Sequence, residues 1–164
     1  KRNWKGKRGV GVCWEKANKK SGVAGIARKC RLVALRAFDG TGNAEDDDIA
    51  SAIVYAADNN VRIVNLSFGD IIPSLLQRDA IRYATSKGEL AFASSGNDGS
   101  KTHPYPSDFA ACASVGGPLL ATDHVSSSQW HPSPTGTRMD PVAQPTTTYS
   151  TPAGGGIQPH TGPA

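Results

Sequence analysis

The stretch whose residue types and spacing most clearly indicate a functional site is Leu90–Ser100, LAFASSGNDGS. It opens with an apolar run of strand length, and the small and polar residues after Ala93 end that run. An open α/β sheet places its site in such loops, at the carboxyl ends of its strands. Asn97 carries an amide that can donate two hydrogen bonds, and Gly96 beside it lets other backbone approach closely. Asn97 is therefore a candidate site residue, with a simple Asn-Asp-Gly turn as the alternative.

Serine and histidine side chains are the other candidates for catalysis, since a histidine base can activate a serine nucleophile. Such a pair needs hydrogen-bond contact and a third group that orients the base. No local pattern joins the serines to Asp123 or Asp140 through a histidine. The four histidines are therefore predicted to be surface residues of loops and of the irregular C-terminal part: His103, His124, His131 and His160.

Six segments are predicted to position these residues. Apolar runs predict strands, and apolar residues spaced three and four apart predict helices. The predicted strands are 31–38 (buried), 61–68, 90–93 and 111–115, and the predicted helices are 45–59 and 74–87. Strands that alternate with helices imply right-handed βαβ crossovers. The predicted fold class is thus an open, mainly parallel α/β sheet.

Individual residues support the two predicted helices. The acidic residues 45–48 suit the positive end of the first helix dipole, with cation binding as the less favoured alternative. In the second helix, Ser74 is a candidate N-cap and Gly88 a C-terminal signal. Its expected apolar face contains Leu76, Ala80, Ile81 and Ala84.

Composition divides the chain of 164 residues into three parts. A basic, poorly structured segment at 1–21 precedes a globular core at 22–125, and 126–164 is rich in Ser, Thr, Pro and Gly. We expect loops with one or two strands, or disorder, in the last part. The formal net charge of +4 lies largely in the first part. A solvated tail is favoured over nucleic-acid binding there, because no nucleic-acid module follows.

The three cysteines form no CxxC pair, so a zinc site is not predicted. Cys30 and Cys112 border apolar strands and are expected to be buried, although a disulfide between them stays open. No apolar run reaches membrane-spanning length, so no membrane contact is expected. The N-terminus shows no signal-peptide core, which leaves a cytosolic, a processed or a truncated chain.

The core resembles the subtilisin-like serine proteases, or subtilases, in four segments that occur in the family's order. GVAGIARKCRLVALRAFDGTG (22–42) resembles the turn and strand after the catalytic histidine. DDDIASAIVYAADNNVRIVNLSFG (46–69) resembles the next helix and strand. LLQRDAIRYATSKGELAFASSGNDGS (75–100) and YPSDFAACASVGG (105–117) resemble the segments that follow. The resemblance implies a subtilisin-like three-layer fold, incomplete at both ends.

The resemblance also implies roles for individual residues. Asn97 matches the asparagine whose amide stabilises the oxyanion during peptide hydrolysis. Two segments match the walls of the pocket for the substrate side chain before the cut, and the loop 39–43 matches a second substrate-binding edge. The implied substrate-binding residues are Ser67, Phe68, Gly69, Ser94, Ser95, Gly96, Gly40 and Gly42. Calcium is the one cofactor that the resemblance suggests, with no readable ligand set.

The triad that the family uses, Asp, His and Ser in that order, is not recognisable. Arg8 stands near the expected histidine and cannot act as a base. One alignment of the C-terminus places Ala164 at the nucleophile, and another matches Pro159-His160 to residues just after a deleted nucleophile motif.

Three functions follow. The first is a subtilisin-like serine endopeptidase core, as a fragment or divergent copy without its own triad. The second is a catalytically inactive module that binds a peptide or a partner protein. The third, a flavodoxin-like ligand-binding domain, is weak because no phosphate-binding context is present. The first two functions imply a peptide or protein partner. The sequence leaves the oligomeric state open. Secretion is expected if the chain is typical of the family.

Overall fold

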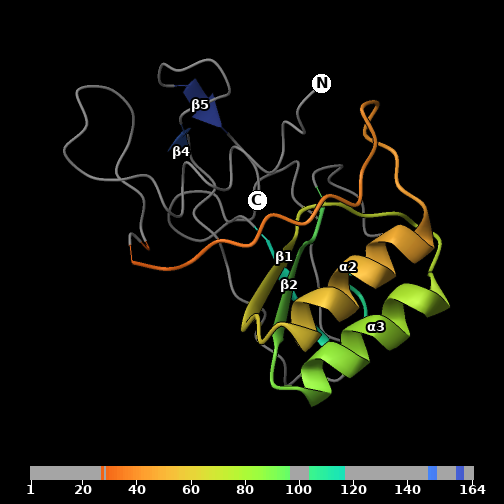
Figure 1. Ribbon diagram of the computed structural model, residues 1–164. Coiled ribbons are helices and arrows are strands. Elements are labelled where there is room, and N and C mark those ends of the chain that lie inside the picture. The colour runs from red at the N-terminus through yellow and green to blue at the C-terminus, as the bar shows by residue number, and fades with distance from the viewer. Residues whose placement is uncertain (1–26, 28, 97–103, 117–147, 151–157, 161–164) are drawn as a thin grey trace.

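Figure 1 shows a computed structural model of the chain, which describes residues 27, 29–96, 104–116, 148–150 and 158–160. The described elements alternate between strand and helix before a final strand pair. In chain order they are α2 (Asp46–Asp58), β1 (Ile63–Leu66), α3 (Leu75–Ser86), β2 (Leu90–Ser94), β3 (Cys112–Val115), β4 (Thr148–Ser150) and β5 (Gln158–His160).

The central sheet has the order β1-β2-β3, and both of its ladders are parallel. The register pairs Leu66 with Ala93 and Ala91 with Cys112. Helix α3 connects β1 to β2 as one βαβ unit, so the carboxyl ends of these strands meet at one edge of the sheet. The predicted open, parallel α/β fold is confirmed.

One face of this sheet is covered by the two helices, which lie side by side (Figure 1). Side chains alternate between the faces of a strand, so residues in register share one face. Leu66, Ala91, Ala93 and Cys112 are buried on the covered face, whereas Ile63 and Leu90 on the other face are 60% and 57% exposed. The core of the described residues therefore lies between the helices and one face of the sheet.

Helix α2 has the predicted bounds to within one residue. Its first turn carries Asp46, Asp47 and Asp48, and Ile49 and Ile53 lie on its buried face. Among the described residues, no group of three His, Cys, Asp or Glu is arranged to hold a metal ion. The three carboxylates of the first turn lie at the positive end of the helix dipole, as predicted.

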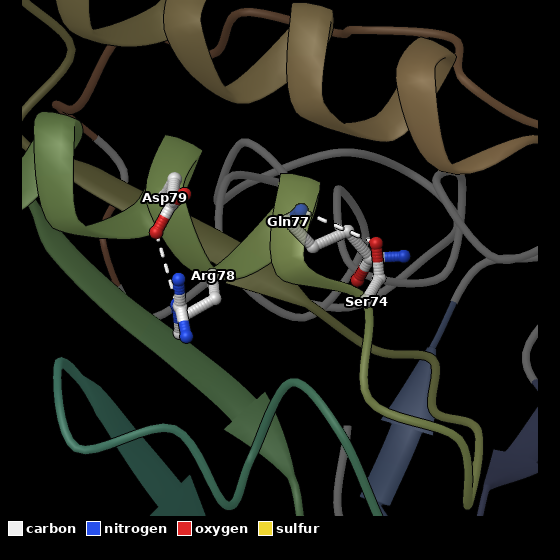
Figure 2. A network of polar contacts seen from close by, with 4 residues as sticks. All are labelled: Ser74, Gln77, Arg78 and Asp79. Atoms are coloured by element: carbon white, nitrogen blue, oxygen red, sulfur yellow. Dashed lines mark hydrogen bonds and ion pairs between the residues drawn. The ribbon is translucent and has the colours of Figure 1, made fainter.

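Helix α3 begins and ends where the sequence indicates. The Ser74 hydroxyl accepts a hydrogen bond from Gln77 N at 3.3 Å (Figure 2), and Gly88 has φ +88° after the last turn. The predicted apolar face is wrong at Leu76, which is 51% exposed, while Gln77 is buried in its place. Gln77 shares a helix face with Ala80, Ile81 and Ala84, and this face packs against the core.

The segment 31–38 is not the buried strand that its apolar sequence predicts. It has no strand ladder, and Figure 1 draws it as a loop. Leu32 and Val33 are exposed, and burial begins only at Ala37 and Phe38, which pack against the core. An apolar run becomes a buried strand only when a neighbour pairs with it, and the central sheet of the described residues ends at β1.

Of the two cysteines predicted to be buried, one is buried and the other is exposed. Cys112 is buried in β3 as expected, but Cys30 is exposed because the adjoining segment does not enter the sheet. No disulfide joins these two described cysteines.

Beyond the central sheet, β4 and β5 form an antiparallel pair, in keeping with the one or two strands expected after residue 126. The composition predicts three parts of the chain, with boundaries at 21/22 and 125/126. Both boundaries lie outside the described residues. None of the described helices is long and apolar enough to cross a membrane.

Candidate functional site

Two predicted site segments leave neighbouring strands at the same edge of the sheet. Ser67–Gly69 follows β1, and Ser94–Gly96 comprises the last residue of β2 and the two residues after it. Because Leu66 pairs with Ala93, these segments begin side by side. The parallel sheet therefore brings together the two segments that were predicted to form the walls of a substrate pocket.

The segment after β1, Ser67–Gly69, is fixed by local contacts. Asn65 Nδ2 donates a hydrogen bond of 2.9 Å to Ser67 Oγ. Phe68 packs on Phe38, with 5.2 Å between the ring centroids and 59° between the ring planes. This aromatic pair also brings the loop that follows Phe38 close to the same segment.

Gly69 and Asp70 join the segment after β1 to the loop 104–109. Asp70 N donates to Tyr105 O at 2.9 Å, and Tyr105 N donates to Asp70 O at 2.7 Å. A Cβ at Gly69 would lie 3.1 Å from Pro104 Cβ and 3.3 Å from Tyr105 O, so the two backbones approach as closely as a glycine allows. Tyr105 in turn stacks on Phe109 at 4.8 Å.

The second segment, Ser94–Gly96, continues the β2–β3 ladder and then turns. Ser95 N donates to Val115 O at 3.0 Å, and the Ser95 side chain is buried, with no hydrogen-bond partner for its Oγ in the described part of the chain. Gly96 has φ +95°, a backbone conformation that glycine adopts without strain. Asn97, the predicted oxyanion donor, lies outside the described residues.

The third predicted element, the loop 39–43, is held by one carboxylate. Asp39 Oδ1 accepts hydrogen bonds from the backbone N of Thr41, Gly42 and Asn43 at 2.8, 2.8 and 3.0 Å. Thr41 Oγ1 also lies within hydrogen-bond distance of both carboxylate oxygens, at 2.7 and 2.8 Å. These bonds, led by that from the Thr41 side chain, lower the pKa of Asp39 from its ordinary value.

Two features near the site were not identified from the sequence. The Asp70–Tyr105 bridge joins residues far apart in the chain, and no local signal marks it. The role of Asp39 did have a signal, because Asp before Gly-Thr-Gly-Asn is a typical start of a turn capped by its own side chain.

A buried carboxyl group also lies at the opposite, amino end of β2. Glu89 is 2% exposed, and neither carboxylate oxygen has a hydrogen-bond partner among the described residues. Burial raises the pKa of Glu89. Glu89 directly precedes β2, so it lies at the opposite end of this strand from Ser94 and Ser95.

The arrangement offers backbone and small side chains along one edge of a parallel sheet. The third element, Gly40 and Gly42, is connected to this edge through the Phe38–Phe68 pair. These contacts connect all three predicted site segments.

Comparison with known proteins gives the same family throughout. The sequence model of the Subtilase family (peptidase family S8) matches residues 2–162. A thermophilic serine proteinase of Bacillus sp. (strain AK1) is 36% identical over 65% of this chain and 27% of its own length. Subtilisin Savinase of Lederbergia lenta is 32% identical over 82% of this chain and 48% of its own length. The chain therefore spans at most about half the length of these relatives.

The fold comparison agrees with the sequence comparison. The solved structure of a protein described as "S41 Psychrophilic Protease" superposes with a TM-score of 0.86 and 27% identity. The superposition covers 98% of this chain and 58% of that protein. By sequence and by fold, the chain belongs to the subtilase family of serine proteases.

Proposed function

We propose that this chain carries the substrate-binding part of a subtilisin-like serine endopeptidase, which hydrolyses peptide bonds in peptide or protein substrates. The observation that carries this proposal is the placement of Ser67–Gly69 and Ser94–Gly96 on neighbouring strand ends of a subtilase fold. In this proposal the two segments form the walls of the pocket for the substrate side chain before the cut. Gly40 and Gly42 form the second binding edge.

Asn97 is proposed as the oxyanion donor. Charge develops on the carbonyl oxygen as the peptide bond is attacked, and a fixed side-chain amide stabilises that charge. Its place directly after Gly96 supports this role, because Gly96 ends the segment that continues β2. The nucleophile and the base remain unassigned, since the sequence shows no recognisable triad.

Three further properties belong to the proposal. The segment 22–125 is proposed as the folded core, with 1–21 and 126–164 as flanking segments. Secretion is proposed as the property typical of the family. Calcium binding is suggested by the family resemblance, but the described residues contain no three-residue cluster suited to a metal ion, so no ligand is assigned.

A chromogenic peptide assay combined with a serine-directed phosphonate tests the proposal. Peptide hydrolysis with covalent labelling of one serine, seen by intact mass, would establish an active peptidase and identify its nucleophile. Peptide binding by calorimetry without labelling would support the substrate-binding role in a catalytically inactive module. A chain that neither binds nor cleaves peptides would contradict the proposal.

A further inference from the structure

Asp39 and Gly40 form one of the two Asp-Gly sequences of the chain, the other being Asp98–Gly99. In such a sequence the backbone N of the glycine can attack Cγ of the aspartate, because glycine has no Cβ to obstruct the approach. The new N–Cγ bond closes a succinimide ring, and one carboxyl oxygen leaves as water with the amide proton and the carboxyl proton. Water then opens the ring at either carbonyl carbon and gives aspartate or isoaspartate.

The attacking group of this reaction is free in the folded chain. Gly40 N has no hydrogen-bond partner among the described residues. Asp39 and Gly40 are both exposed, and a Cβ built on Gly40 would meet nothing within 4 Å. Neither burial nor a steric contact therefore keeps Gly40 N from Cγ of Asp39.

The attacked group, the Asp39 carboxylate, is held in place instead. Its Oδ1 accepts hydrogen bonds from the backbone N of Thr41, Gly42 and Asn43 at 2.8, 2.8 and 3.0 Å. Ring closure removes one oxygen from this carboxyl group and makes the other an imide carbonyl, so the group must give up these contacts. The hydrogen bonds also lower the pKa of Asp39, which makes the protonated form that loses water less populated.

Conversion at this position would reach the candidate site. Isoaspartate carries the backbone through its side chain, which adds one methylene group to the main chain directly after Phe38. The Phe38 ring packs on Phe68, the middle residue of Ser67–Gly69, with 5.2 Å between the centroids. A longer main chain at residue 39 would therefore shift the loop relative to the segment after β1.

We propose that Asp39–Gly40 is a latent site of isoaspartate formation that the folded loop protects, with the Thr41 hydroxyl as the main protecting group. Thr41 has this role because its Oγ1 lies within hydrogen-bond distance of both carboxylate oxygens, at 2.7 and 2.8 Å. The protection concerns the chemical durability of the loop, so it does not depend on the proposed function.

The test measures isoaspartate in the full chain and in two variants. Thr41→Val removes the hydroxyl but keeps the branched shape of the side chain, and Thr41→Ser is the matched control that keeps the hydroxyl. Each chain is incubated at neutral pH, folded in buffer and unfolded in guanidinium chloride, and is then digested with trypsin. The peptides 37–62 and 88–101 each contain one Asp-Gly sequence. Chromatography with electron-transfer fragmentation gives the isoaspartate fraction of each peptide.

We expect the wild-type chain to convert Asp39 at least about fivefold more slowly when folded than when unfolded, the equivalent of one net hydrogen bond. Thr41→Val should convert Asp39 about fivefold faster than the wild type in the folded chain, and Thr41→Ser should match the wild type. The three chains should be equal in guanidinium chloride. Conversion at Asp98 should be the same in the three folded chains and serves as the internal reference.

Three results would overturn the inference. Equal conversion of Asp39 in the folded and the unfolded wild-type chain would show that the loop gives no protection, and this comparison is decisive even if Thr41→Val does not fold. Equal rates at Asp39 in folded wild type and folded Thr41→Val, as judged by circular dichroism, would exclude the hydroxyl as the protecting group. Faster conversion at Asp98 as well as at Asp39 in Thr41→Val would show a general loosening of the fold in place of local protection.

Discussion

The rings of Phe38 and Phe68 pack against each other at a tilt, with 5.2 Å between their centroids, although thirty positions separate the two residues in the chain. One ring precedes the loop that Asp39 organises, and the other lies in the segment that leaves β1. This contact links two of the three elements proposed to bind a peptide.

Gly69→Ala should destabilise the protein by about 1–3 kcal/mol, the usual cost of an overpacked position. The new Cβ would lie 3.1 Å from Pro104 Cβ, in a rigid ring, so the two backbones must separate and the Asp70–Tyr105 bridge must weaken. Urea unfolding measures the change. Gly40→Ala is the matched control, since its Cβ meets nothing within 4 Å and its effect should be small. Equal effects of the two substitutions would refute the close approach.

Ser74→Ala should lower the free energy of unfolding by about 1 kcal/mol, because it removes the N-cap acceptor for Gln77 N. Ser74→Asp keeps a side-chain acceptor and should restore most of the stability. Thermal unfolding followed by circular dichroism provides the comparison. Ser86→Ala at the other end of α3 changes the same residue type without removing an N-cap and should have the smaller effect.

Gln77→Ala should cost about 1–2 kcal/mol in chemical unfolding, as expected for a partly buried hydrogen bond to a charged group. Gln77 Nε2 donates to Asp46 Oδ1 at 2.7 Å and so ties α3 to α2. Asp46→Asn retains an acceptor and should have a much smaller effect. A loss of stability in Asp46→Asn as large as that in Gln77→Ala would mean that charge, rather than the hydrogen bond, holds the helices together.

Glu89 should make the protein less stable as the pH rises. Burial raises the pKa of Glu89 above its ordinary value of 4.5, so the folded state favours the protonated form. The stability from this group is complete below pH 4.5 and is lost as the pH rises through the raised pKa. Glu89→Gln cannot ionise, so its free energy of unfolding minus that of the wild type should increase with pH from acid toward neutral. A difference that stays constant between pH 4 and pH 8 would show that Glu89 is not a buried carboxyl group.

Asn97→Ala should leave the fold nearly unchanged, within about 0.5 kcal/mol of the wild type, because the role proposed for Asn97 is in the site and not in the core. Equilibrium unfolding in urea measures this. A loss of about 1–3 kcal/mol would instead identify the amide as a buried structural hydrogen bonder and would count against the oxyanion role.

The sequence was sufficient wherever the determining contacts are local. Ser74 and Gly88 mark the ends of α3 because a cap and a glycine turn involve only nearby residues. The apolar runs identify β1, β2 and β3, and their alternation with helices predicts the parallel sheet. The family resemblance likewise depends on ordered segments that can be read without a structure.

The tertiary structure decided the features that depend on which segments meet. The apolar segment 31–38 predicts a strand, yet it lies outside the sheet and leaves Cys30 exposed, because pairing requires a neighbour that propensity cannot supply. Gln77 rather than Leu76 faces the core, because the packing of α2 against α3 selects the buried side of the helix. The Asp70–Tyr105 bridge and the Phe38–Phe68 pair join distant residues. The sequence by itself determined the family, the local elements and the candidate residues, while long-range contacts alone decided which of those residues lie together.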